Sequence, residues 1–141
     1  MTNEPTPRHA LIVLASRLAI CRLAADHPVP TWAWAGEFGS VTRTRDEVSV
    51  VCPEAAVPAT VRAERGWRAL RVAGTQDLAL VGVLASLAGP IATAGASVFA
   101  LATYDTDYLL VRDEALPAVV AALTAAGHTF AINPPALTTP A

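Results

Sequence analysis

The C-terminal half of the chain alternates strand-like and helix-like patterns in an order that few folds accommodate. The strand-like segments are 67–74, 97–104, 107–112 and 128–132, and the helix-like segments run from 81 to 91 and from 116 to 123. The strands alternate apolar and polar side chains, whereas the helices repeat apolar residues at three- and four-residue steps. The order is therefore strand, helix, strand, strand, helix, strand. It predicts an α+β fold of the ferredoxin-like βαββαβ type, with an antiparallel sheet and both helices on one face.

The first helix of this pattern contains a proline. Its apolar positions are Val81, Leu84, Leu87, Ala88 and Ile91. Asp77 is placed to cap its start and Gly95 to end it. Pro90 should remove one backbone hydrogen bond and bend the helix near Ser86. We expect a helix here, but not a regular one.

The first half of the chain is β-rich and contains little helix. Its strand-like segments are 10–15, 18–24, 38–44 and 47–52. Residues 1–8 and 133–141 lack periodicity and are expected to be loose tails. The folded part should therefore run from His9 to Ile132.

Composition excludes several classes of protein. Ten arginines and no lysine stand against twelve acidic residues, and the arginines are scattered, so neither nucleic-acid binding nor lysine-dependent catalysis is expected. No stretch approaches the roughly 20 uninterrupted apolar residues that span a bilayer. The polar N-terminus does not resemble a signal peptide. We expect a soluble, cytoplasmic protein with no membrane or nucleic-acid partner.

The residues that usually form metal sites or nucleophiles are isolated. His9, His27 and His128 have no second ligand at metal-binding spacing, so each is interpreted as surface or strand-end packing. Cys21 and Cys52 lie in apolar segments and are interpreted as small buried side chains. The sequence therefore predicts no metal, no cofactor and no enzymatic activity.

The segment TYDTDY (103–108) concentrates polar chemistry between two strands. It contains two carboxylates, two hydroxyls and two phenols. Ordinary hairpin chemistry explains Asp105 and Asp107, but a binding corner that accepts a ligand ammonium group explains them also. Trp67 and Trp34 pose a similar choice between core and binding platform, and Trp67 is expected in the core beneath the helices.

Several of these segments together resemble a known family. The resemblance is strongest in ATYDTDYLLVRDE (102–114), where the family has STxxTDxxLV, and in GSVTRTRDEVSVVCPE (39–54). The chain resembles the tandem ACT-domain proteins of the CASTOR type, which include bacterial two-ACT proteins and the cytosolic arginine sensors of animals. Ala102 stands where that family usually has serine.

The resemblance implies two small ACT units packed side by side. It divides the chain into a helix-poor ACT-like unit over 9–64 and an ACT domain over 65–132. It also implies that an amino acid binds between ACT units, near the start of the second strand and the hairpin corner. The implied ligand contacts are Gly82, Ser97, Val98, Thr103, Tyr104, Thr106 and Asp107.

Two functions remain open at this point. The first is an amino-acid-binding regulatory or sensor protein, expected to be a homodimer with the small-molecule ligand at the interface between units. The second is an adaptor that binds no ligand and uses ACT-type assembly only to join proteins.

Overall fold

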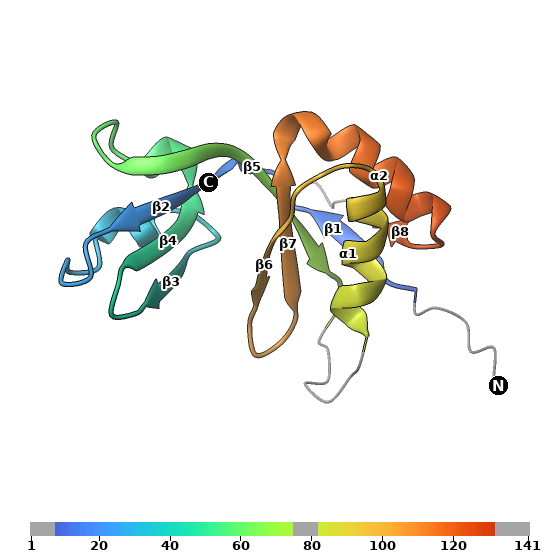
Figure 1. The fold of residues 1–141 in the computed structure, drawn as a ribbon, viewed down its shortest axis with the longest axis horizontal. Coiled ribbons are helices and arrows are strands. Elements are labelled where there is room, and N and C mark those ends of the chain that lie inside the picture. The colour runs from blue at the N-terminus through green and yellow to red at the C-terminus, as the bar shows by residue number, and fades with distance from the viewer. Residues whose placement is uncertain (1–7, 75–81, 132–141) are drawn as a thin grey trace. The chain divides into compact units, whose positions relative to one another are not determined.

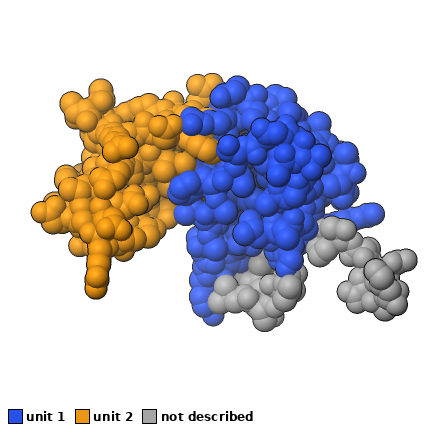
Figure 2. All heavy atoms as spheres, in the orientation of Figure 1, with its two compact units in different colours: residues 1–15, 69–141 blue, residues 16–68 orange. Residues whose placement is uncertain are grey.

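The computed structural model describes residues 8–74 and 82–131. These residues form two compact units, which Figure 2 draws in separate colours. Unit 1 comprises residues 1–15 and 69–141, and unit 2 comprises residues 16–68. The strand β5 (Arg62–Val72) contributes residues to both units and pairs with other strands in each. The described residues contain eight strands and two α-helices, which confirms the predicted α+β class.

Unit 1 has the predicted βαββαβ order from β5 onward (Figure 1). Its elements are β1 (Ala10–Val13), the end of β5, α1 (Val83–Thr93), β6 (Phe99–Ala102), β7 (Asp107–Arg112), the 3₁₀ turn η3 (Asp113–Ala115), α2 (Leu116–Ala125) and β8 (Thr129–Phe130). The strands β6 and β7 form an antiparallel hairpin, and β7 also pairs with β5.

The strand β1 lies in unit 1, although the expected division placed it in a unit over 9–64. It pairs antiparallel with β5, with Leu11 opposite Val72, and parallel with β8, with Ala10 opposite Thr129. The strand β1 is thus inserted between β5 and β8. Leu11 is completely buried in the core of unit 1, which is the physical reason for this placement. The expected boundary at residue 64 also differs, because unit 2 extends to Arg68.

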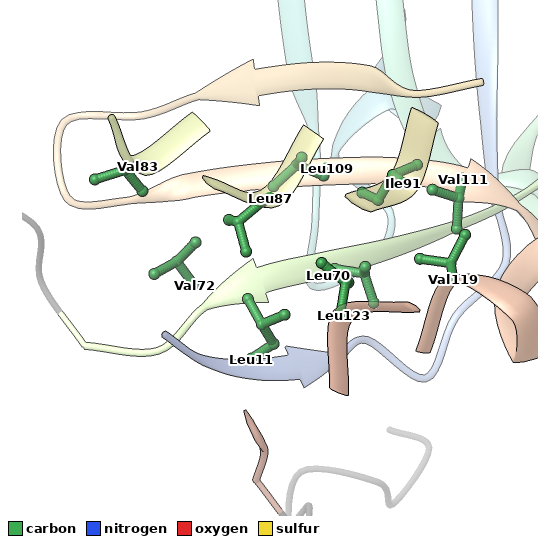
Figure 3. Close-up of a cluster of buried hydrophobic side chains, with 10 residues drawn as sticks. All are labelled: Leu11, Leu70, Val72, Val83, Leu87, Ile91, Leu109, Val111, Val119 and Leu123. Atoms are coloured by element: carbon green, nitrogen blue, oxygen red, sulfur yellow. The ribbon is translucent and has the colours of Figure 1, made fainter. Parts of the chain in front are cut away.

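The core of unit 1 lies between the sheet and its two helices (Figure 3). Its buried side chains are Leu11, Leu70, Val72, Val83, Leu87, Ile91, Leu109, Val111, Val119 and Leu123. In α1 the buried face repeats every four residues from Val83 to Leu87 to Ile91. Leu84 was expected on this face but is 46% exposed, because it directly follows Val83 and so lies about 100° around the helix from the buried line of residues. The residues Asp77 and Val81 lie outside the described part of the chain.

Pro90 lies inside α1, as expected, and the helix continues to Thr93. A proline has no N–H to donate to the carbonyl four residues earlier, which here belongs to Ser86. The ring of His128 replaces the missing donor, since its Nε2 lies 3.0 Å from the Ser86 carbonyl oxygen. The defect in the helix is thus satisfied by a side chain from the connection between α2 and β8.

Unit 2 is a small antiparallel sheet without an α-helix. It contains β2 (Leu18–Leu23), β3 (Ser40–Arg43), β4 (Val48–Pro53), the first part of β5, and the 3₁₀ turns η1 (Thr31–Trp34) and η2 (Glu54–Ala56). Its strand order is β3-β4-β2-β5. Ala33 of η1 is completely buried in the core that these strands form, so this short turn takes the place of a covering helix. The expectation of a helix-poor first half is confirmed.

The two cysteines are buried on neighbouring strands of unit 2 and are free thiols. Burial raises the pKa of Cys21 to about 11, and the adjacent Cys52 contributes to this rise. Burial also raises the pKa of Cys52. The interpretation of both residues as small buried side chains is confirmed, and neither is a thiolate at neutral pH.

The two tryptophans for which the sequence left a choice between a core side chain and a binding platform differ in their environment. Trp67 is buried, but it pairs with Leu18 in unit 2 and is not part of the cluster beneath the helices of unit 1. The expected position beneath both helices is therefore wrong, because β5 passes from one unit to the other at Arg68. Trp34 is 58% exposed.

No helix within residues 8–74 and 82–131 is long and apolar enough to span a membrane. The predicted loose tails lie outside the described residues, apart from the exposed Arg8.

Candidate functional site

The hairpin turn between β6 and β7 forms a closed polar corner. We call residues Thr103–Asp107 the corner cluster. The backbone N–H of Thr103 donates to the Thr106 carbonyl oxygen at 2.9 Å, and the Thr103 hydroxyl donates to the same oxygen at 3.1 Å. The Thr106 N–H lies 3.3 Å from the Thr103 hydroxyl oxygen, which it can use as acceptor. The turn is therefore held by Thr103 and Thr106 together.

Thr106 also attaches the corner cluster to the central part of the sheet. It is only 6% exposed, and its hydroxyl donates to the Val72 carbonyl oxygen of β5 at 2.8 Å. A buried hydroxyl of this kind needs a partner, and Thr106 finds it within the fold. The predicted ligand contact at Thr106 has therefore already used its only hydroxyl hydrogen.

The other side chains of the corner cluster are more open. Tyr104 is 81% exposed. Asp105 is also exposed, whereas Asp107, the first residue of β7, is partly buried. The two carboxylates thus differ in environment. Asp107 is the one whose charge is partly shielded from water, and such a charge attracts an opposite charge more strongly.

Gly82 lies at the N-terminus of α1, as predicted. It is the N-cap residue, with φ 85° and ψ 2°, a left-handed conformation that glycine adopts without strain. No side chain caps this end of the helix. Figure 3 shows Val83, the next residue, at the end of the core where the β6–β7 hairpin turns. The first N–H groups of the helix, which have no intrahelical partner, therefore begin at the same end of unit 1 as the corner cluster.

Ser97 and Val98 lie at the other end of unit 1. They precede β6 in the connection that follows α1, and β6 then leads to the corner. Six residues of extended chain cover up to about 20 Å, so Ser97 is far from Thr103 within one copy. The seven predicted contacts thus form two groups, with five at the corner end and two at the opposite end.

A pair of histidines lies beside the corner, and the sequence did not predict it. The backbone N–H of His9 donates to Nδ1 of His128 at 3.1 Å. The two rings stack with their centroids 5.7 Å apart and their planes 9° from parallel. Because Nδ1 of His128 accepts a hydrogen bond, its ring proton must be on Nε2, where it is donated to Ser86. His128 is thus a buried side chain that joins β1, β8 and α1.

His9 is influenced by its surroundings in two directions. Burial lowers the pKa of His9, and the neighbouring His128 lowers it further. The Asp107 carboxylate raises it, which is the smallest of the three effects. His9 therefore stays within the electrostatic range of the acid that the sequence selected for ligand binding.

The comparisons with known proteins agree with this architecture. A family model described as an ACT domain matches residues 62–125, and a second model, described as an N-terminal domain, matches residues 16–60. The crystal structure of protein Atu0741 from Agrobacterium tumefaciens is 36% identical, covers 91% of this chain and 96% of its own, and has a TM-score of 0.85. This chain carries an ACT domain and belongs to the family of Atu0741.

More distant structures share the fold of this ACT-domain protein. A protein of unknown function from Vibrio cholerae, VC0802, described as a possible transport protein, is 17% identical, with a TM-score of 0.68 over 83% of this chain and 88% of that one. The regulatory subunit of aspartate kinase from Thermus thermophilus, in its ligand-free form, is 13% identical, with a TM-score of 0.57 over 88% of this chain and 99% of that one.

All seven predicted contacts lie within the segment that matches the ACT domain. Neither His9, which precedes β1, nor His128, which precedes β8, does. The N-terminal segment therefore brings to the corner of this ACT domain a histidine from outside the matched segment. Chemically, the corner offers a partly shielded carboxylate, free helix N–H groups and an imidazole.

Proposed function

We propose that the chain is a regulatory protein of the tandem ACT type that binds an amino acid at the corner cluster of unit 1. The observation that carries this proposal is the placement of Asp107. A partly buried carboxylate stands at the end of the ACT domain where α1 begins. These two features are complementary to the two charged ends of an amino acid, because a carboxylate attracts an ammonium group and free helix N–H groups attract a carboxylate.

Gly82 supports the carboxylate half of this proposal. It is exposed, and a Cβ built on it would meet no described atom within 4 Å, so the backbone is open to close approach. The left-handed φ at this position strains any other residue. Gly82→Ala should therefore weaken binding by disturbing the helix start, and it should also lower stability by about 1 kcal/mol or more.

The edge strand β6 supports the predicted homodimer. It pairs only with β7 among the described residues, and its sequence FALA has no charge or proline to discourage pairing with another strand. Antiparallel pairing of two β6 strands about a two-fold axis would bring Ser97 of the second copy to the corner cluster. That arrangement would reunite the two groups of predicted contacts and place the ligand between ACT domains of two copies.

The dimer is tested by a charge on this edge. Ala100→Lys places a charged side chain on an exposed position of β6 and should yield a species of about 15 kDa in sedimentation at tens of micromolar, whereas the unmodified chain should sediment at twice that mass. Ala121→Lys on the exposed face of α2 is the matched control. If only Ala121→Lys is monomeric, the interface is assigned to the helices instead. If the unmodified chain is itself monomeric, the predicted homodimer is wrong.

Ligand binding is tested by screening the twenty amino acids for an increase in melting temperature, followed by calorimetry. Asp107→Ala removes one partner of a charged hydrogen bond, which typically costs about 2–5 kcal/mol, so affinity should fall by a factor of roughly thirty or more. Asp105→Ala, two residues earlier and exposed, is the matched control and should keep the affinity. Equal affinity in Asp107→Ala and the unmodified chain contradicts the assignment of Asp107.

A second candidate is the adaptor that binds no ligand, and the threonines of the corner favour it. The hydroxyls of Thr103 and Thr106 are both bonded within the fold, so two of the polar groups expected to face a ligand have a structural explanation. If no amino acid raises the melting temperature while the dimer persists, this candidate replaces the first. The absence of catalysis and of a cofactor, and the cytoplasmic location, stay predictions.

A further inference from the structure

One polar atom near the corner cluster is buried without a partner. Nε2 of His9 is inaccessible to water and has no hydrogen-bond partner among the described residues. The ring itself is fixed, because it stacks on His128 and because the His9 backbone is bonded to Nδ1 of that residue. His128 is in turn bonded to Ser86 of α1. A buried, immobilised and unpartnered nitrogen is uncommon and calls for an explanation.

The register of the strands places His9 and Asp107 on the same face of the sheet. His9 precedes Leu11 by two residues, and Asp107 precedes Leu109 by two. Leu11 and Leu109 both lie in the core beneath the helices, so alternation along a strand puts His9 and Asp107 on the helix side as well.

The segment that separates them is the end of β5. In the antiparallel pairing of β1 with β5, Leu11 lies opposite Val72, and the Ala73 N–H donates to the Ala10 carbonyl oxygen at 2.8 Å. Extending this register by one residue places His9 opposite Gly74. On the other side of β5, the Thr106 hydroxyl binds the Val72 carbonyl oxygen, so the start of β7, where Asp107 lies, is next to the C-terminal end of β5. Gly74 itself has no side chain, and a Cβ built on it would meet no described atom within 4 Å.

We propose that His9 is a competitor for Asp107, so that protonation of His9 pairs it with this carboxylate and displaces the ammonium group of the bound amino acid. This inference rests on the proposed function, since it concerns the same site. A neutral imidazole leaves Asp107 available to the ligand. An imidazolium offers Asp107 an internal cation, held in place by the stack on His128, and the ligand then has to replace it.

Within the described part of the chain, few charged groups surround His9. His128 stacks on its ring and has both nitrogens bonded, and the neighbouring Arg8 lies against Gly127. The helices α1 and α2 carry no titratable side chain, and Arg71 of β5 lies on the opposite face of the sheet from Val72. Among residues 8–74 and 82–131, Asp107 is the acid whose charge acts on His9, and its effect on the pKa of His9 is in the direction that pairing requires.

The first arm of the test needs no ligand. The histidine rings of the full chain are labelled with ¹³C, His27→Gln helps to assign their signals, and the pKa of His9 is measured by NMR titration. Asp107→Asn should lower the pKa of His9, while Asp105→Asn should leave it unchanged. An unchanged pKa of His9 in Asp107→Asn overturns the inference.

The second arm measures binding of the amino acid that gives the largest thermal shift at pH 7.5. Its affinity should fall about tenfold between neutral pH and one unit below the measured pKa of His9, and His9→Gln should abolish this dependence. Binding that does not depend on pH, or a dependence that persists in His9→Gln, overturns the competition but not the site. If none of the twenty amino acids binds at pH 7.5, the proposed function fails and the inference fails with it, whatever the titration shows.

Discussion

The bond between His128 and the Ser86 carbonyl can be tested through the proline that makes it necessary. His128→Leu replaces the imidazole with an apolar side chain of similar size and so removes both ring nitrogens. The carbonyl of Ser86 then loses its donor, since Pro90 has no N–H, and the His9 N–H loses its acceptor. We expect His128→Leu to destabilise unit 1.

The size of the effect follows from the two backbone groups that are left. A buried polar group without a partner costs about 1–3 kcal/mol, so two of them suggest a loss of about 2–5 kcal/mol, with the part-buried His9 N–H at the lower end. Pro90→Ala restores an N–H four residues after Ser86 and lets the helix satisfy its own carbonyl. In that background His128→Leu should cost about 1–2 kcal/mol less, because one of the two groups keeps a partner.

The measurement is a double-mutant cycle by urea unfolding of the full chain. The four proteins are the unmodified chain, His128→Leu, Pro90→Ala and the double variant. Pro117, at the start of α2, provides a control proline, because His128→Leu should cost the same with and without Pro117→Ala. If His128→Leu costs the same within about 0.5 kcal/mol in the unmodified chain and in the Pro90→Ala background, the two residues are not coupled and the reasoning is refuted.

Four further predictions concern single sites. Trp67→Ala should lower the free energy of unfolding by about 3–5 kcal/mol because a large buried side chain is lost, and a change below about 1 kcal/mol in urea unfolding would argue that its site collapses or is exposed. Thr106→Val should cost about 1–3 kcal/mol by leaving the Val72 carbonyl without its donor, whereas the exposed Thr103 should tolerate valine better, as urea unfolding of both variants can show. The lowered pKa of His9 means that the folded state binds a proton on His9 less readily than the unfolded state does. The contribution of His9 to stability should therefore be complete above pH 6.5, fall as the pH drops from 6.5 to the folded pKa, and then level off. Denaturation at several pH values should show this component, and His9→Gln should lack it. Cys21, with its pKa of about 11, should react with iodoacetamide at pH 8 far more slowly in the native chain than in urea, as mass spectrometry can report.

The elements of unit 1 that depend on local periodicity were predictable. The strand β5, the β6–β7 hairpin and both helices follow from apolar spacing within short stretches of chain, and the structure has them in the predicted order. The missing bond at Pro90 was also predictable, because it depends only on the chemistry of proline. The exposed Leu84 shows the limit of this approach, since the apolar pattern identified the helix but assigned Leu84 to its buried face, which runs through Val83, Leu87 and Ile91 instead.

The assignment of β1 could not be made from local pattern. Residues 10–13 predict a strand, but nothing within them indicates whether it pairs with the strand that follows or with distant partners such as the end of β5. The same separation hid the histidine pair, because His9 and His128 are 119 residues apart. Spacing rules for ligand sites look along the chain, and both residues appeared isolated there.

The sequence by itself determined the α+β class, the βαββαβ order, the buried state of both cysteines and the polar character of the corner between β6 and β7. Each of these depends on interactions between near neighbours in the chain or on the average polarity of a segment. Only the tertiary structure decided that β1 completes unit 1, that Trp67 belongs to unit 2, that His128 supplies the donor lost at Pro90, and that His9 shares a sheet face with Asp107. These outcomes depend on which distant strands pair, and the pairing is selected by burial of side chains such as Leu11 in a common core.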